Sequence, residues 1–410
     1  MRLLIGTGGG HVDFSKGLET VMDWAQRGGH TVLASLGGWK GIEQGGDKVV
    51  DITGHSFSEL RNSGGSFILS SRTNPDSQKV AENFRRYGID AALFYGGDDT
   101  LGKARELHSG FKLPIVGWPK TMDNDTNGSY ATIGYTTAAH RAAQLTREAY
   151  DTARTHSKIV LLPVFGRSTD WVCAAAADFG HADFVIPAEK KGLTLERIAS
   201  GIRSAYEFNK AQYGSSFAVV VISEAASGVE GLNPYFTKYL FGKEPLIDNY
   251  ENPKLQPEIL GLAIADALSD KLGIDKSKTA LKVATYHLRD GKLTPIDEQF
   301  ALRTAEECIR LISQGDFGNV ATIQDPDVAG SLPSDENLYV NANGKILFVG
   351  RMSFEEASKR RPVLGTGFFD YENLKPTEQL TKYLIPLLGQ KTENPRSHAS
   401  LFKPAQPLHN

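Results

Sequence analysis

Two short acidic segments of this 410-residue chain carry the residue types that metal-assisted and proton-transfer chemistry needs. Gly96–Thr100 (GGDDT) follows the apolar run 91–95, and Pro119–Asp125 (PKTMDND) follows the run 114–118. Such runs are typical of buried parallel strands, whose carboxyl ends meet at one edge of a sheet. One acidic loop alone is explained as a turn, because Asp and Asn favour turns. Two in succession indicate an active site, because gathered carboxylates repel one another unless a metal ion or proton transfer employs them.

The elements around these loops alternate between strand and helix, which predicts an α/β fold of two Rossmann-like domains with mostly parallel, helix-covered sheets. In the first half we expect strands at 3–6, 31–34 and 91–95 and helices at 15–26, 77–87, 100–108 and 136–155. In the second half we expect strands at 158–165, 183–187, 217–223 and 282–286 and helices at 195–213, 257–272 and 295–314.

This pattern predicts domains at 1–155 and 156–325, followed by a C-terminal extension, 326–410, that packs back on the core. Within the extension, Asn-Ala-Asn-Gly between two apolar runs predicts a hairpin over 338–349. The polar, Pro- and Gly-punctuated stretch 233–253 is interpreted as an insertion loop, and the polar tail beyond about residue 391 as poorly ordered.

The composition is that of a soluble globular protein, 40% hydrophobic and 23% charged. A net charge of −3 gives no reason to expect nucleic acid or an anionic membrane as partner. No apolar run reaches membrane-spanning length. The two cysteines, Cys173 and Cys308, form neither a disulfide framework nor a metal spacing, so we expect a reducing, cytoplasmic setting.

The order and spacing of Gly-Gly-Asp and Pro-Lys-Thr-x-Asp-Asn-Asp resemble the phosphofructokinase family. The resemblance covers residues 1–325 and implies a donor domain at 1–155 and a sugar-phosphate domain at 156–325. The Gly-rich loop Thr7–Gly10 after the first strand lacks the Gly-Lys-Ser/Thr of a Walker A motif. By the resemblance, Gly8 and Gly9 contact the donor phosphates. The family's usual Asp and Pro-Gly become Gly10 and Val12-Asp13 here.

The donor implied by the resemblance is pyrophosphate. ATP-dependent relatives typically have Gly at the position of Asp99, which leaves room for the α-phosphate. A carboxylate about 4 Å from a phosphate charge costs about 4 kcal/mol at an effective dielectric of 20, roughly a thousandfold against ATP. Lys120, which often is Gly in those relatives, can neutralise a small, highly charged donor. Gly97 and Thr100 complete the predicted donor site.

The catalytic groups follow from the same resemblance. Asp123 is the expected base for the acceptor hydroxyl, and Thr121 hydrogen-bonds the phosphoryl group. Asp98 is the expected ligand of Mg²⁺, with Asp125 placing the metal or the base. Gly64–Arg72 resembles the family's Gly-Gly-Thr-x-Leu-x-Ser-x-Arg, so Arg72 is expected to hold the transferred phosphate.

The acceptor side resembles the family less closely. Phe165-Gly166-Arg167 stands for the family's Met-Gly-Arg, and Ser223-Glu224 for its Ser/Thr-Glu, whose Glu binds sugar hydroxyls. Within Tyr286–Gly291, Arg289 is expected to clamp the 6-phosphate beside Tyr286, although Thr285, Leu288 and Asp290 depart from the family pattern. Lys158 falls where one family Arg is usual, a position often contributed by a neighbouring subunit; a solvated charge is the alternative for Lys158.

The resemblance therefore predicts an Mg²⁺-dependent phosphoryl transfer from pyrophosphate to O1 of fructose 6-phosphate, by a homodimer or homotetramer. The alternatives are another acceptor such as sedoheptulose 7-phosphate, ATP as donor, and a catalytically silent regulatory homologue. A lipid or NAD kinase shares Gly-Gly-Asp-Gly-type loops but lacks the heptad Pro119–Asp125. Retention of Asp98, Asp123, Asp125 and Arg72 counts against the silent homologue.

Overall fold

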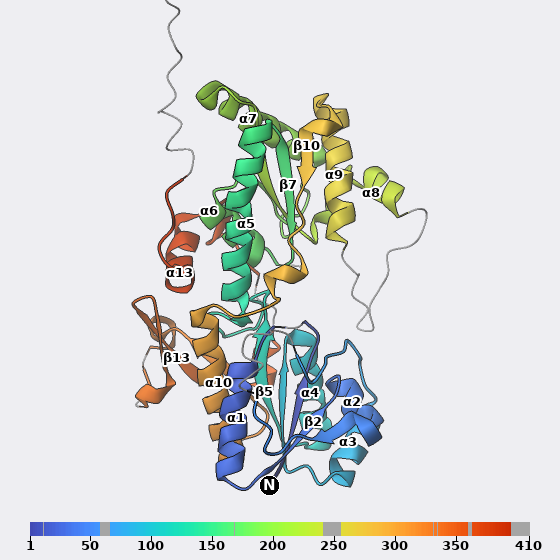
Figure 1. Ribbon diagram of the computed structural model, residues 1–410, viewed down its shortest axis with the longest axis vertical. Coiled ribbons are helices and arrows are strands. Elements are labelled where there is room, and N and C mark those ends of the chain that lie inside the picture. The colour runs from blue at the N-terminus through green and yellow to red at the C-terminus, as the bar shows by residue number, and fades with distance from the viewer. Residues whose placement is uncertain are drawn as a thin grey trace, which may run out of the picture. The chain divides into compact units, whose positions relative to one another are not determined.

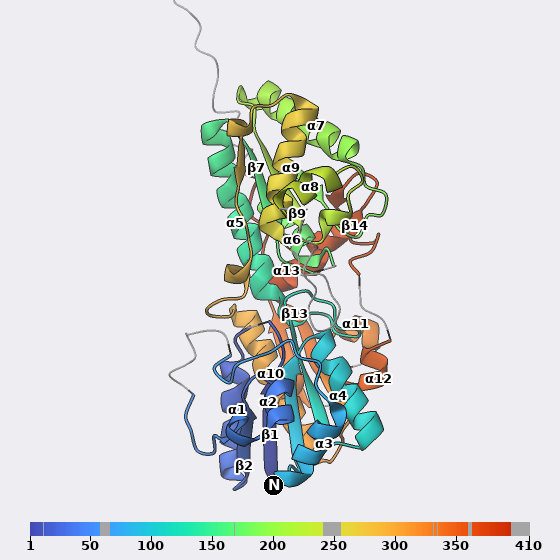
Figure 2. The same ribbon diagram turned by 90° about the vertical axis from the view of Figure 1, so that its right-hand side faces the viewer.

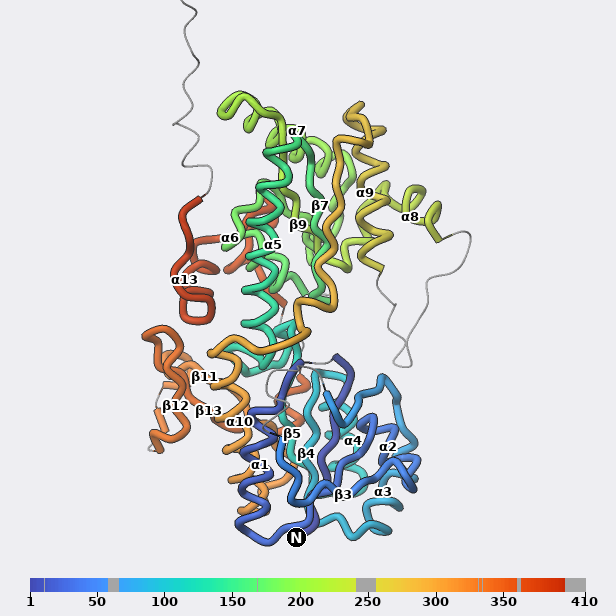
Figure 3. Tube along the Cα trace, viewed as in Figure 1, coloured from blue at the N-terminus to red at the C-terminus, as the bar shows by residue number. Residues whose placement is uncertain are grey.

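The computed structural model of the protein describes residues 1–10, 12–57, 66–167, 169–240, 256–330, 332–333, 335–359 and 363–394. The chain forms two compact units (Figure 1). Unit 1 contains the described residues of Met1–Ala138 and Tyr286–Val363, and unit 2 those of Ala139–Glu244, Leu255–Thr285 and Leu364–Asn410. The chain thus enters unit 2, returns to unit 1 and enters unit 2 again, a path that Figure 3 traces by colour.

The sheet of unit 1 has nine strands among the described residues, in the order β12-β13-β11-β5-β4-β1-β2-β3, with β6 beside β5. The strands of its centre are parallel: β1 (Arg2–Thr7), β2 (Thr31–Ser35), β4 (Ala91–Gly96), β5 (Ile115–Thr121) and β11 (Asn319–Gln324). The edges are antiparallel: β3 (Val49–Asp51), β13 (Lys345–Ser353) and β12 (Tyr339–Ala342). The short β6 (Ile133–Gly134) is parallel to β5.

Helices cover both faces of this sheet because its central strands are apolar on both faces, as β4, whose six residues are all buried, shows best. Figures 1 and 2 show α1 (Ser15–Arg27) and α10 (Pro295–Ser313) on one face, with α2 (Trp39–Gln44), α3 (Ser77–Arg86) and α4 (Asp98–Phe111) on the other. One core cluster packs Phe94 and Ile115 against Trp39, Phe84 and Leu107 of the second group.

Unit 2 has a parallel sheet with four strands among the described residues, β10-β7-β9-β8, formed by Thr279–Leu281, Ile159–Val164, Ala218–Ser223 and Phe184–Ile186. Alternate residues of β7 face opposite sides. Leu161 joins the core under α7 (Leu195–Tyr213) and α9 (Pro257–Leu272), whereas Val160 packs with Tyr150 of α5 (Tyr135–His156). The helix α6 (Trp171–Gly180) completes the cover of this sheet and is buried along its whole length.

The C-terminal extension contributes to both units. Its residues 339–353 form the hairpin β12–β13 that extends the sheet of unit 1. From Leu364 onward the extension belongs to unit 2. There the ring centroids of Phe368, and of Tyr383 in α13 (Glu378–Leu388), lie 5.3 and 5.2 Å from that of Trp171. Remaining short elements are η1 (Gly46–Lys48), η3 (Ala226–Gly228), α8 (Asn233–Tyr239), η4 (Lys276–Lys278), η5 (Tyr286–Leu288), α11 (Pro326–Ala329), η6 (Glu336–Leu338), α12 (Phe354–Ala357), β14 (Phe369–Asp370) and β15 (Lys375–Pro376).

The α/β class, the mostly parallel sheets and the hairpin are confirmed, the last with Asn343 and Gly344 at the positive φ angles its turn requires. The compact units differ from the expected boundaries, because 286–325 belongs to unit 1 and the extension divides between the units. The start of the expected insertion loop is the helix α8, which Pro234 begins without losing a backbone hydrogen bond. Its remainder, 241–253, and the tail 395–410 lie outside the described residues. Among the described helices, none is long and apolar enough to cross a membrane.

Candidate functional site

The predicted donor residues gather at the carboxyl edge of the unit 1 sheet. Strands β1, β4 and β5 are parallel neighbours, with Thr7 opposite Tyr95 and Gly96 opposite Pro119. The Gly-rich loop and the two acidic loops therefore leave the sheet side by side. This is the edge of an open α/β sheet at which ligands bind.

Glycines bring these loops into contact where a side chain would not fit. A Cβ added to Gly8 would lie 1.7 Å from Oγ1 of Thr100, and one added to Gly9 would lie 2.9 Å from Cγ of Arg72. A Cβ on Gly97 would lie 3.3 Å from Cβ of Thr121. Residues from four separate segments thus meet in close contact at this sheet edge.

Lys120 is the buried cation of this site, with 2% of its surface exposed. Its Nζ donates hydrogen bonds to the carbonyl oxygens of three successive glycines, at 3.3 Å to Gly8, at 2.9 Å to Gly9, and to Gly10. Burial lowers the pKa of Lys120 to about 7; the positive charges of Arg289 and Arg72 act in the same direction, and Asp123 opposes them.

Arg289 lies in this site of unit 1, although the resemblance places it on the acceptor side. A Cβ added to Gly10 would lie 3.5 Å from Nη1 of Arg289 and 3.8 Å from Nζ of Lys120. The guanidinium of Arg289 stacks on the exposed ring of Tyr286 at 4.9 Å. Three cations, Arg72, Lys120 and Arg289, therefore surround the Gly-rich loop, which is an arrangement suited to a multiply charged anion.

The loop after β5 holds the expected base. The backbone N–H of Asp123 donates to Oγ1 of Thr121 at 3.1 Å. Thr132 closes the loop: its hydroxyl donates to the carbonyl of Thr121 at 2.5 Å, and its N–H donates to Oδ1 of Asn124 at 3.0 Å. Asn124 adopts a positive φ of 56°, a conformation that Asn tolerates better than most residues. Asp123 is half-buried and Asp125 is buried.

The expected metal ligands fit Mg²⁺ only in company with a phosphate ligand. Asp98, exposed, and Asp99, half-buried, occupy the first turn of α4 at the same sheet edge as Asp125. No group of three or more His, Cys, Asp or Glu side chains suited to a metal occurs in the part of the chain that the structure describes. Mg²⁺ is commonly held by one or two carboxylates together with phosphate oxygens and water. Asp98 and Asp125 can supply the carboxylates, and the donor would supply the phosphate oxygens.

The acceptor residues of unit 2 form a second constellation. Strands β7 and β9 end together, and Oε1 of the buried Glu224 accepts the backbone N–H groups of Gly166 at 3.0 Å and Arg167 at 2.6 Å. Phe165 is fixed by a bond from its N–H to the carbonyl of Ala284 at 3.0 Å. Lys158 precedes β7 and Arg167 follows it, so the six-residue strand, about 20 Å long, lies between them. Within unit 2, Lys158 is thus not brought together with Arg167 and Glu224.

Unit 2 also contains a carboxylate pair that we did not predict, the buried Asp170 and the half-buried Glu189. Oδ1 and Oδ2 of Asp170 accept the N–H groups of Ala188 and Glu189, at 2.8 and 2.9 Å, and Oε1 of Glu189 accepts the N–H of Asp170 at 2.9 Å. The Tyr371 hydroxyl donates to Glu189 at 2.7 Å. Burial, reinforced by the charge of Glu189, raises the pKa of Asp170 to about 6.

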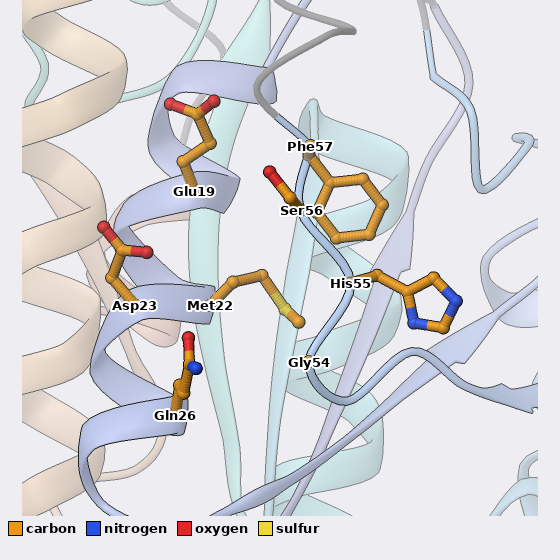
Figure 4. A pocket seen from close by; sticks show the side chains of 8 residues that line it. All are labelled: Glu19, Met22, Asp23, Gln26, Gly54, His55, Ser56 and Phe57. Atoms are coloured by element: carbon orange, nitrogen blue, oxygen red, sulfur yellow. The ribbon is translucent and has the colours of Figure 1, made fainter.

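A cavity of about 210 Å³ in unit 1 lies away from all of these residues. Figure 4 shows the α1 side chains of Glu19, Met22, Asp23 and Gln26 along one side of it and residues 54–57 along the other. It contains none of the predicted site residues.

Gly10 belongs to the site in unit 1, although we did not predict it as a site residue. The sequence contains a signal for it, because Gly10 replaces the Asp that is usual in the family.

Comparisons with known proteins identify the family of this chain. The profile of the family "Phosphofructokinase" matches residues 3–312. The pyrophosphate–fructose 6-phosphate 1-phosphotransferase of Dictyoglomus thermophilum is 29% identical over 324 residues, 78% of this chain and 88% of that protein. The ATP-dependent 6-phosphofructokinase 2 of Streptomyces coelicolor is 29% identical over 313 residues, 73% of this chain and 83% of that protein.

The fold has the same relatives. The crystal structure of a pyrophosphate-dependent phosphofructokinase from Marinobacter aquaeolei superposes with a TM-score of 0.73 at 18% identity, covering 96% of this chain and 93% of that chain. The chain therefore belongs to the phosphofructokinase family, a family of phosphotransferases.

Proposed function

We propose that this protein transfers a phosphoryl group from pyrophosphate to O1 of fructose 6-phosphate, with Mg²⁺ as cofactor. The observation that carries the proposal is the gathering of Arg72, Lys120 and Arg289 around Gly8–Gly10. Pyrophosphate concentrates its charge in two phosphate groups and offers no apolar surface, so a compact group of cations supplies most of its binding free energy. The names of the relatives from Dictyoglomus thermophilum, Streptomyces coelicolor and Thermoproteus tenax support pyrophosphate as donor.

The chemical step needs little covalent help from the protein. The acceptor oxygen attacks the distal phosphorus, the P–O–P bridge breaks, and inorganic phosphate leaves. Asp123 takes the proton of the acceptor hydroxyl, and Arg72 and Thr121 stabilise the charge that spreads over the transferred group. Bound Mg²⁺, held by Asp98 and Asp125, would neutralise donor charge.

In unit 2, the residues proposed to bind the acceptor are Arg167 and Glu224. Lys158, at the far end of β7 from Arg167, is proposed to serve the site of a neighbouring subunit, which supports a homodimer or homotetramer. A cytoplasmic protein is supported by Cys173 and Cys308, both buried free thiols.

The donor is tested with fructose 6-phosphate and Mg²⁺, by comparing pyrophosphate with ATP for the wild type, Asp99→Gly and Asp99→Asn. We expect the wild type to use pyrophosphate and the glycine variant to gain ATP activity. The asparagine variant removes the charge and keeps the volume, so it separates repulsion from steric exclusion. ATP activity in the wild type contradicts the proposed donor. Activity with pyrophosphate only when sedoheptulose 7-phosphate replaces fructose 6-phosphate would retain the donor and correct the acceptor.

A further inference from the structure

The Gly-rich loop turns its carbonyl groups, rather than its amides, toward Lys120. An ammonium group has three N–H bonds, and Nζ of Lys120 has three carbonyl acceptors, those of Gly8, Gly9 and Gly10. These acceptors belong to one continuous turn of backbone, so the three oxygens converge on one point. Convergent backbone carbonyls are the ligands that bind K⁺ ions in proteins.

The peptide geometry gives this contact a consequence for the donor. In a planar trans peptide the C=O and N–H groups point in opposite directions. With the carbonyls of Gly8 and Gly9 fixed on Nζ, the N–H groups of Gly9 and Gly10 point away from the ammonium. Because the carbonyls converge on Nζ, these N–H groups diverge on the opposite side of the loop, where each can donate to a separate oxygen of a bound anion.

We propose that the carbonyl oxygens of Gly8, Gly9 and Gly10 form a monovalent-cation site that Lys120 fills with its own tethered ammonium. Lys120 is then a positioning residue: its three N–H bonds hold the carbonyls of the Gly-rich loop, and its charge acts on the donor through space, beside Arg72 and Arg289. The cation site is inferred from the three hydrogen bonds of Nζ, whereas its effect on donor binding rests on the proposed function.

The residue at position 10 explains why the loop needs the contact with Lys120. A carboxylate at position 10, where the family usually has Asp, would lie beside both Lys120 and Arg289, because a Cβ there is 3.8 and 3.5 Å from their nitrogens. With Gly10 instead, the carbonyl of Gly10 takes part of that role and contacts Nζ directly. The ring of Tyr95, 5.5 Å from Nζ, gives a further favourable contact.

The test is chemical rescue of Lys120→Ala. This substitution removes three carbons and the nitrogen, so n-propylammonium fits the space and restores the three N–H bonds. In the absence of any substrate, we expect millimolar propylammonium to raise the Tm of the variant by about 2–4 °C and to leave the wild type unchanged. n-Propanol, which has the same shape without charge, and tetramethylammonium, which has charge without N–H groups, should have no effect.

Activity gives the second readout. We expect Lys120→Ala to lose about a hundredfold in kcat/KM for pyrophosphate, because a misplaced loop costs that much, and propylammonium to restore at least about tenfold. Lys120→Arg keeps the charge but cannot place three N–H bonds on one point, so it should remain impaired. Lys120→Met fills the space and should resist rescue.

Two outcomes overturn the proposal: no effect of propylammonium on the Tm of a folded Lys120→Ala protein, or full activity of Lys120→Arg. If the Tm responds but neither variant nor wild type uses pyrophosphate, the cation site stands and the proposed donor is wrong. If pyrophosphate is used and the Tm does not respond, the donor stands and the cation site is wrong.

Discussion

Lys120 in unit 1 and Asp170 in unit 2 are both buried ionisable side chains, and the two are held in opposite ways. Lys120 in unit 1 is 2% exposed and donates to three backbone carbonyls. Asp170 in unit 2 is 1% exposed and accepts two backbone N–H groups. Burial moves both pKa values toward neutrality, to about 7 and about 6, from ordinary values of 10.5 and 3.8.

The neighbours of the two groups separate a ligand site from a structural cluster. Around Lys120 the like charges of Arg289 and Arg72 are only partly opposed by Asp123, so an anion bound beside the three cations lowers the free energy of the group. Around Asp170 the like charge of Glu189 is already met from within the chain, by the hydroxyl of Tyr371. Both clusters are thus desolvated. They differ because Tyr371 of the chain donates to the Asp170–Glu189 pair, whereas the three cations around Lys120 are suited to an anion from outside the chain.

The largest expected effect separates activity from stability. Asp123→Asn should reduce kcat by about 10²–10⁴-fold, because the acceptor hydroxyl loses its base, and should change the free energy of unfolding by less than about 0.5 kcal/mol. Steady-state kinetics and urea denaturation measure the two quantities. Asp23→Asn, at an exposed position of α1, is the control and should alter neither. Near-normal turnover by Asp123→Asn would remove Asp123 from the mechanism.

The pH dependence of stability should differ in sign between the two buried charges. Asp170 binds its proton more tightly in the folded protein, so its stabilising contribution is complete below pH 3.8 and is lost as the pH rises through about 6, about 3 kcal/mol in all. Lys120 binds its proton less tightly in the folded protein. Its contribution to stability therefore increases as the pH rises from about 7 to 10.5, by about 5 kcal/mol.

Urea denaturation across pH 4–10 measures these contributions as differences from the wild type. Asp170→Asn should flatten the acidic limb alone, and Lys120→Met the basic limb alone. Equal curves for Asp170→Asn and wild type between pH 4 and 6 would show that the pKa of Asp170 is not raised in the folded protein.

The smallest expected effect concerns Tyr371, whose hydroxyl donates to Glu189 of the Asp170–Glu189 pair. Tyr371→Phe removes a hydroxyl that donates to carboxylates, which should cost about 2 kcal/mol of stability at pH 8. The loss should be smaller at pH 5, where Asp170 carries a proton and the need for an outside donor falls. Tyr339→Phe removes a hydroxyl bonded to the carbonyl of Pro333 at 2.8 Å and should cost about 1 kcal/mol, independent of pH. A pH-independent effect of Tyr371→Phe would separate that hydroxyl from the acid pair.

The sequence predicts the loop edge of unit 1 well because its strands are short, apolar and bounded by glycine, and because its polar residues follow them directly. It does not predict that Arg289 lies close to Lys120, because 169 positions separate the two residues and the chain passes through unit 2 in between. The cluster of Asp170, Glu189 and Tyr371 has no local signature either. Apart from the bonds of the Tyr371 hydroxyl, its carboxylates accept backbone N–H groups, which every residue except proline offers.

The repeated passage of the chain between the units has a consequence for how the protein is made. Strand β5, which carries Lys120, pairs with β11, and β11 pairs with β13, which ends at Ser353. The ribosome must therefore synthesise the whole sheet of unit 2 before the sheet of unit 1 can be completed. Unit 2 in turn awaits residues 364–388, and with them Tyr371. A nascent chain of this protein therefore cannot complete unit 1 before most of unit 2 has been synthesised, and unit 2 reaches its native packing only after residues 364–388 have followed.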